Sequence, residues 1–89
     1  MVWTIEYTNT ALKQLKKMDR QIARSIFEFL DDRVATLENP KKLGKKLVGP
    51  QFGTYWRFRL GDFRILCDIK DQKLTILVIE IGHRKEVYR

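Results

Sequence analysis

Three arginines stand in a segment that alternates between apolar and basic side chains. Arg57 and Arg59 flank Phe58, and Arg64 follows after Gly61-Asp62. Alternate side chains of a strand point to opposite faces, so Arg57 and Arg59 share the face away from an apolar core, and the parity of Arg64 on the next strand is the same. Guanidinium groups bind phosphate. Exposed strands also carry arginine for solubility, but the convergence of three favours an anion site.

A second candidate set follows the last apolar run of the chain. His83 belongs to the side-chain type that exchanges protons near neutral pH, Arg84 is a permanent cation, and Tyr88 has a phenol that stacks on bases or donates a proton. Side chains of these three types are suited to binding RNA and to catalysing its cleavage. Each also has a structural alternative, namely an exposed histidine, an arginine without a phosphate and a tyrosine that caps the core, and spacing alone does not decide.

The positive charge is concentrated in the second half of the chain. The net charge is +7, yet residues 1–40 contain equal numbers of basic and acidic side chains, so the whole excess follows Pro40. A basic surface suits a polyanion because each neutralised phosphate releases counterions. A solvated basic face that maintains solubility is the alternative interpretation of charge taken alone.

The apolar pattern predicts the elements that would position these side chains. Alternation predicts a strand over residues 2–7. Apolar spacings of three and four predict a short helix that ends near Met18 and a second that begins after Asp19 and ends at Asn39-Pro40. Residues 41–53 contain glycines and four lysines and read as a basic connecting loop.

Three further strands complete the predicted fold. Alternation predicts strands over residues 55–60 and 63–69, and a nearly continuous apolar run predicts a central strand over residues 74–81. The order β-α-α-β-β-β predicts a single α+β domain over residues 1–89, with the helical hairpin packed on one face of a four-stranded sheet.

Composition excludes several classes of protein. The chain has one cysteine, Cys67, and one histidine, so it forms no intramolecular disulfide and lacks the ligands for a zinc site. No apolar run is long enough to span a membrane. The first residues do not resemble a signal peptide, so we expect a cytoplasmic protein.

At this point the sequence resembles a known family. The run from Tyr55 to Leu66 and the run from Ile81 to Arg89, which reads I-G-H-R-K-E-V-Y-R, are similar to the RelE/ParE superfamily of bacterial and archaeal toxins, on its RelE side. The likeness covers nearly the whole chain and includes the Lys-Leu-Val-Gly stretch from Lys46 to Gly49.

This resemblance implies a toxin that enters the ribosomal A site and cuts mRNA there, and that a cognate antitoxin protein holds inactive. It implies attack of the ribose 2′-hydroxyl on the adjacent phosphorus, with no metal or organic cofactor. The reaction requires a proton acceptor for the 2′-hydroxyl, stabilisation of the phosphorane charge and a proton for the leaving oxygen.

The resemblance also implies roles for individual residues. Arg64 matches the phosphate-binding arginine of the family, Arg84 its second catalytic arginine and Tyr88 its tail tyrosine. Arg57 and Arg59 stand where the best-known member carries lysines, and an arginine binds charge but does not serve as a base. We therefore expect His83 to act as general base or acid.

Two further lysines, Lys45 and Lys46, are expected to steer the RNA or rRNA backbone. Two other functions remain open at this stage. One is a ParE-like toxin that inhibits DNA gyrase by binding, without nuclease chemistry. The other is a catalytically inactive module that binds RNA or the antitoxin. The tail residues His83, Arg84 and Tyr88 favour the nuclease.

Overall fold

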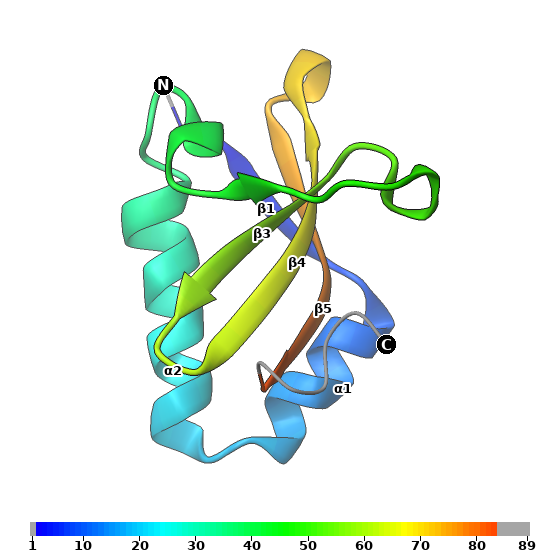
Figure 1. Cartoon of the computed structure of the whole chain (residues 1–89). Helices are drawn as coiled ribbons and strands as arrows, with labels where there is room; N and C mark the ends of the chain where they lie inside the picture. Colours follow the sequence, from blue (N-terminus) through cyan, green and yellow to red (C-terminus); the bar gives the residue numbers. More distant parts are fainter. Residues whose placement is uncertain (1, 84–89) are drawn as a thin grey trace.

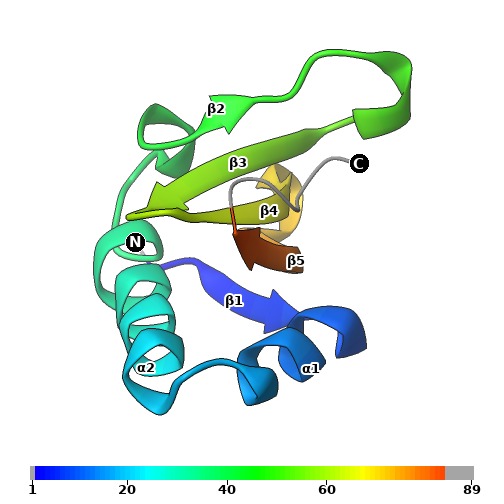
Figure 2. The same ribbon diagram turned by 60° about the horizontal axis from the view of Figure 1, so that its bottom comes forward.

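The protein is a five-stranded mixed sheet with two helices on one face, as seen in the computed structural model, which describes residues 2–83 (Figures 1 and 2). The strands are ordered β1-β5-β4-β3-β2; β1 runs parallel to β5, and all other neighbours are antiparallel. The elements are β1 (Thr4–Tyr7), α1 (Asn9–Lys17), α2 (Arg20–Glu28), β2 (Lys45–Lys46), β3 (Tyr55–Leu60), β4 (Phe63–Lys70) and β5 (Thr75–His83). The predicted α+β class is confirmed.

Side-chain caps determine where both helices begin. The Thr8 hydroxyl accepts a hydrogen bond from the Ala11 amide before α1, and the Asp19 carboxylate accepts one from the Gln21 amide before α2. Each cap satisfies a backbone donor that has no partner within the helix. The second helix is shorter than predicted: its α form ends at Glu28, and the π-helical segment Phe29–Val34 that continues it ends before Asn39.

The core lies between the helices and one face of the sheet. Phe58 of β3, Ile26 of α2 and Ile65 of β4 are each 0% exposed, as are Ile76 and Val78 of β5. Burial of each large apolar side chain stabilises the fold by about 1.5–3 kcal/mol. These contacts determine which face of each strand is buried, and therefore which side chains of β3, β4 and β5 remain on the opposite face, which we call the open face.

The loop predicted for residues 41–53 contains an additional strand. The two residues of β2 pair with β3, Lys45 opposite Arg57 and Lys46 opposite Trp56. The prediction of four strands is therefore wrong, because the sheet has five within residues 2–83. Two exposed lysines show no alternation of apolar and polar side chains from which a strand could be predicted. Their extended conformation follows from pairing with the partner strand. Single 3₁₀ turns, Pro40–Lys42 and Pro50–Phe52, lie on either side of β2.

Strand β5 lies between β1 and β4, and on its β1 side the hydrogen-bond partner changes halfway along the strand. β1 pairs with β5 only from Thr75 to Val78. Beyond that point α1 takes over on this side of β5: the Thr8 hydroxyl donates to the Ile79 carbonyl at 2.6 Å, and the Gln14 side-chain oxygen accepts from the Ile81 amide at 2.6 Å. Two side chains at the start and middle of α1 thus replace a neighbouring strand.

A β-bulge in β5 lies at this same place. Cys67 of β4 is opposite Val78, but the adjacent Leu66 is opposite Glu80, so Ile79 is the additional residue. In a regular strand Glu80 would share the core face with Val78, because residues two apart point the same way. The bulge reverses this parity and places Glu80 on the open face.

No helix within residues 2–83 is long and apolar enough to cross a membrane.

Candidate nucleic-acid interface

Three arginines meet on the open face, as the sequence predicted. Phe58 is fully buried against the helices, so Arg57 and Arg59 on either side of it point the opposite way. Arg59 is directly opposite Arg64 of β4, and Arg57 is the diagonal neighbour of Arg64. Directly opposed side chains have Cβ atoms about 5 Å apart and diagonal ones about 7–8 Å. These spacings allow two or three guanidinium groups to contact one phosphodiester.

The lysines of β2 divide between the two faces. Lys45 is opposite Arg57 and extends the basic row on the open face, whereas Lys46 is opposite Trp56, whose ring packs against the core on the helix side. The structure therefore brings Lys45 together with the arginines and does not bring Lys46 there. We call Lys45, Arg57, Arg59 and Arg64 the basic row.

The guanidinium groups differ in their surroundings. The Arg59 side chain is exposed, while Arg57 and Arg64 are half-buried. One Arg64 terminal nitrogen donates to the carbonyls of Gly61 and Phe63, at 3.4 and 3.3 Å. The Arg57 Nε is buried, and no residue of the described part of the chain accepts a hydrogen bond from it. A buried donor without a partner is costly, so an anion that reaches it gains affinity.

His83 lies on the opposite face from the basic row. It is opposite Phe63 at the end of β5, and the two rings make an edge-to-face contact, with centroids 6.1 Å apart and planes at 77°. It borders a groove that also includes Gln14 and Lys17 of α1 and Met18, the residue that follows this helix. The sequence prediction placed His83 in a tail beyond the strand, but β5 extends through this residue, so pairing fixes its face.

Arg84 and Tyr88, the other two predicted catalytic residues, lie outside the described residues.

Sequence reasoning missed one polar side chain on the open face. Glu80 of β5 is half-buried on the far side of Leu66 from Arg57. The one available signal was a glutamate within an apolar run, which indicates that the alternation of buried and open side chains is interrupted there. The bulge that determines its direction depends on hydrogen bonds with α1, which the sequence of β5 does not reveal.

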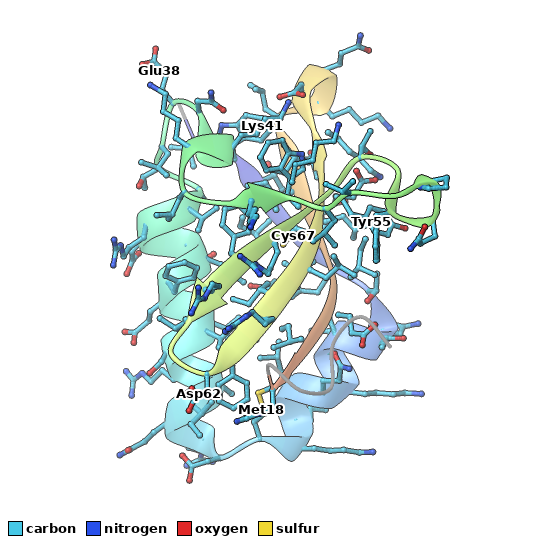
Figure 3. All side chains as sticks on the ribbon, in the orientation of Figure 1. Met18, Glu38, Lys41, Tyr55, Asp62 and Cys67 are labelled. Atoms are coloured by element: carbon cyan, nitrogen blue, oxygen red, sulfur yellow. The ribbon has the colours of Figure 1, made fainter. Side chains whose placement is uncertain are left out.

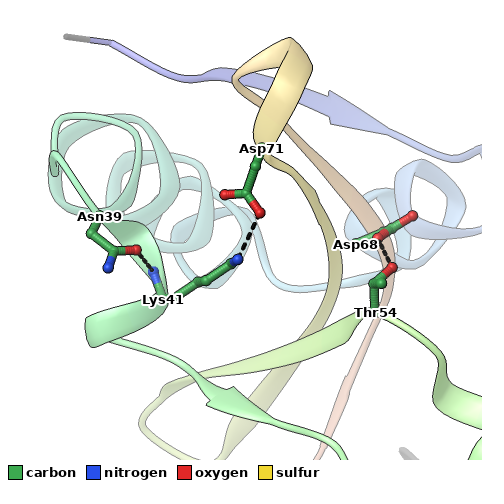
Figure 4. A network of polar contacts seen from close by, with 5 residues as sticks. All are labelled: Asn39, Lys41, Thr54, Asp68 and Asp71. Carbon is green, nitrogen blue, oxygen red and sulfur yellow. Dashed lines mark hydrogen bonds and ion pairs between the residues drawn. The ribbon is translucent and has the colours of Figure 1, made fainter.

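A small polar network secures the end of the sheet beside β2 (Figure 4). The Lys41 amide is bonded to the Asn39 side chain at 3.2 Å, and the Lys41 ammonium is paired with Asp71 at 2.6 Å. The Thr54 hydroxyl donates to Asp68 at 2.6 Å. The first two contacts lie at the entry to β2, and the third lies at the entry to β3.

Two titratable groups lie on the helix side and outside the candidate interface. Burial raises the pKa of the Cys67 thiol far above its ordinary value, and it also raises the pKa of the Tyr7 phenol, with a further contribution from Asp31. In Figure 3, Cys67 is marked within the sheet, Tyr55 marks the start of β3, and Asp62 marks the turn between β3 and β4. No three of the His, Cys, Asp and Glu side chains in residues 2–83 gather as metal ligands.

Comparison with known proteins identifies the family. The family model described as "ParE toxin of type II toxin-antitoxin system, parDE" matches residues 5–88. The chain belongs to the RelE/ParE toxin superfamily. Within it, this RelE-like toxin is 30% identical to toxin RelG of Mycobacterium tuberculosis over 89 residues, which covers 100% of this chain and 99% of RelG. It is 27% identical to the mRNA interferase toxin RelE of Escherichia coli, over 99% of this chain and 92% of that protein.

The fold of this RelE-like toxin is also found in solved structures. A chain in the crystal structure of the toxin–antitoxin complex RelBE2 from Mycobacterium tuberculosis superposes with a TM-score of 0.84 at 26% identity, and the match covers 97% of this chain and 95% of that one. The family and fold that the sequence motifs implied are thus confirmed.

Proposed function

We propose that this type II toxin is a ribosome-dependent endoribonuclease that cuts mRNA in the A site. The observation that carries the proposal is the basic row on the open face of the sheet, with Arg59 directly opposite Arg64 and Lys45 directly opposite Arg57. A relative at 27% identity is named an mRNA interferase, which agrees with this use of the row.

In the proposed reaction the open face holds the scissile phosphodiester. Arg59 and Arg64 bind its non-bridging oxygens and stabilise the charge that develops when the 2′-hydroxyl attacks phosphorus. Arg57 and Lys45 bind the adjacent backbone. Arg84 and Tyr88 of the following tail are proposed to add a second phosphate contact and a stacking surface, and Lys46 contacts rRNA from the other side of β2. The chain needs no metal in this scheme.

His83 remains a proposed proton-transfer group, although its ring faces α1. The ribosome orients the mRNA for the reaction, and the orientation of reacting groups alone accounts for a large part of many rate enhancements. Free RNA is therefore expected to be a poor substrate. A cognate antitoxin is the proposed protein partner, because the superposed RelBE2 chain comes from a toxin–antitoxin complex.

The test is primer extension on an mRNA in a translating extract, with wild type, Arg59→Ala and Arg64→Ala. Arg24→Ala is the matched control, because Arg24 is an exposed arginine of α2 on the other side of the molecule. Loss of one phosphate contact is expected to slow cleavage about tenfold to a hundredfold, while the control cleaves like wild type.

Intact mRNA in the presence of wild-type protein would contradict the proposal. A gyrase supercoiling assay run in parallel then separates the two alternatives: inhibition indicates a ParE-like toxin, and no inhibition leaves an inactive binding module.

A further inference from the structure

The bulge in β5 places a carboxylate beside the basic row. Glu80 would lie on the core side if β5 were regular, and the additional residue Ile79 moves it to the open face. Bulges recur next to active sites, where they redirect a side chain. Thr8, which caps α1, and Gln14 of α1 hold this bulge through hydrogen bonds to Ile79 and Ile81, so its geometry is built into the fold.

The surroundings of Glu80 place it within reach of a bound phosphodiester. Glu80 is the diagonal neighbour of Arg64, which lies on the adjacent strand β4. It lies two strands from Arg57, with Leu66 of β4 between them. Two inter-strand spacings separate these backbones by about 10 Å, which accommodates a ribose and its phosphate between the two side chains. A nucleotide whose scissile phosphate is bound by Arg64, with Arg57 on the adjacent backbone, therefore presents its sugar towards Glu80.

The carboxylate of Glu80 is available for chemistry. No hydrogen bond or ion pair joins it to another residue in the range 2–83, although it is half-buried. Asp68, on the same face, differs because its carboxylate accepts the Thr54 hydroxyl at 2.6 Å. Glu6 of β1 is also on this face but lies at the sheet edge, opposite Leu77 and one strand farther from the row.

The three arginines of the basic row leave one role unfilled on this face. Guanidinium groups donate hydrogen bonds and stay protonated, so the arginines stabilise charge but do not remove the proton of a 2′-hydroxyl. An ionised carboxylate has no proton to donate, and it can accept one from a hydroxyl group. His83 lies on the helix side, away from this face.

We infer that Glu80 is the general base of the cleavage reaction. Its carboxylate takes the proton of the ribose 2′-hydroxyl as that oxygen bonds to phosphorus. The bond from phosphorus to the 5′-oxygen breaks, this oxygen leaves with the electron pair and takes a proton from water, and the products are a 2′,3′-cyclic phosphate and a 5′-hydroxyl. The inference rests on the proposed nuclease function and assigns it a residue.

A carboxylate beside arginines also lowers their mutual repulsion, and the experiment must separate this effect from base catalysis. Asp68→Asn is the matched control, since it removes one negative charge from the same face while an amide oxygen still accepts the Thr54 hydroxyl. Glu80→Gln removes the base and keeps the size of the side chain. Glu80→Asp keeps a carboxylate at a shorter reach.

The assay is the single-turnover cleavage rate of ribosome-bound mRNA at saturating protein, with ribosome affinity and thermal unfolding measured for each variant. We expect Glu80→Gln to cleave at least about a hundredfold more slowly at unchanged affinity, because a general base contributes that much or more. Asp68→Asn is expected to cleave like wild type, and Glu80→Asp at an intermediate rate.

Each other outcome overturns the inference in a distinguishable way. Cleavage by Glu80→Gln at the wild-type rate removes Glu80 as base and leaves the nuclease function standing. Equal losses in Glu80→Gln and Asp68→Asn assign the effect to the charge of the face. A wild-type protein that does not cleave at all refutes the proposed function together with the inference.

Discussion

Removing the Gln14 side-chain oxygen should destabilise the protein and disturb the bulge. That oxygen accepts the Ile81 amide at 2.6 Å, where β1 no longer pairs with β5. Gln14→Met keeps the length of the side chain and a similar helix propensity but leaves the amide without this acceptor. A buried donor that loses its partner costs about 1–3 kcal/mol, and we expect the lower half of that range because Gln14 is half-buried.

The assay is the free energy of unfolding from urea denaturation, combined with hydrogen exchange at the Ile81 amide. Gln14→Glu is the matched control, because a carboxylate oxygen accepts the same hydrogen bond. We expect the methionine variant to lose stability, to exchange faster at Ile81 and to cleave more slowly through misplaced Glu80, while the glutamate variant keeps most of each property. Equal stability of the methionine variant and wild type would refute this account of β5.

Three further variants or conditions test other parts of the structure. Phe58→Ala should cost about 3–5 kcal/mol because the ring is fully buried, which circular dichroism during urea denaturation will measure; a smaller loss would mean a loosely packed core. Lys41→Met should change the free energy of unfolding by less than about 1 kcal/mol, since its ion pair with Asp71 is solvent-exposed. Burial raises the pKa of Cys67 and Tyr7, so the folded chain keeps protons that the unfolded chain releases; stability should hold below the ordinary thiol value of 9.0 and fall as pH rises above it. Unfolding measured near neutral pH and again at about pH 10.5 checks the sign, which a rise in stability would contradict.

Local patterns predicted most of the fold. The alternation of apolar and basic side chains predicted both the bounds of β3 and the face on which each of its arginines lies. Phe58 is buried, so its two neighbours in the strand point away from the core. The position of Asp19 predicted where the second helix begins. The turn between β3 and β4 follows from Gly61, whose positive φ of 57° is unfavourable for other residues.

The features that local patterns missed depend on contacts between distant segments. Lys45 is extended because β3 pairs with it, and two residues show no period of their own. The side on which Glu80 and His83 lie depends on one additional residue in β5, which Thr8 and Gln14 stabilise from more than sixty positions away in the chain. The candidate site was therefore predictable for its arginines and not for its carboxylate.

The central claim is that the basic row on the open face binds mRNA on the ribosome for cleavage. The most direct measurement uses purified protein and programmed ribosomes with an empty A site, and maps 5′ ends of the mRNA. The account predicts a cut within the A-site codon that weakens in Arg59→Ala and persists in Arg24→Ala. Cleavage equal in both variants, or an uncut message, would contradict it.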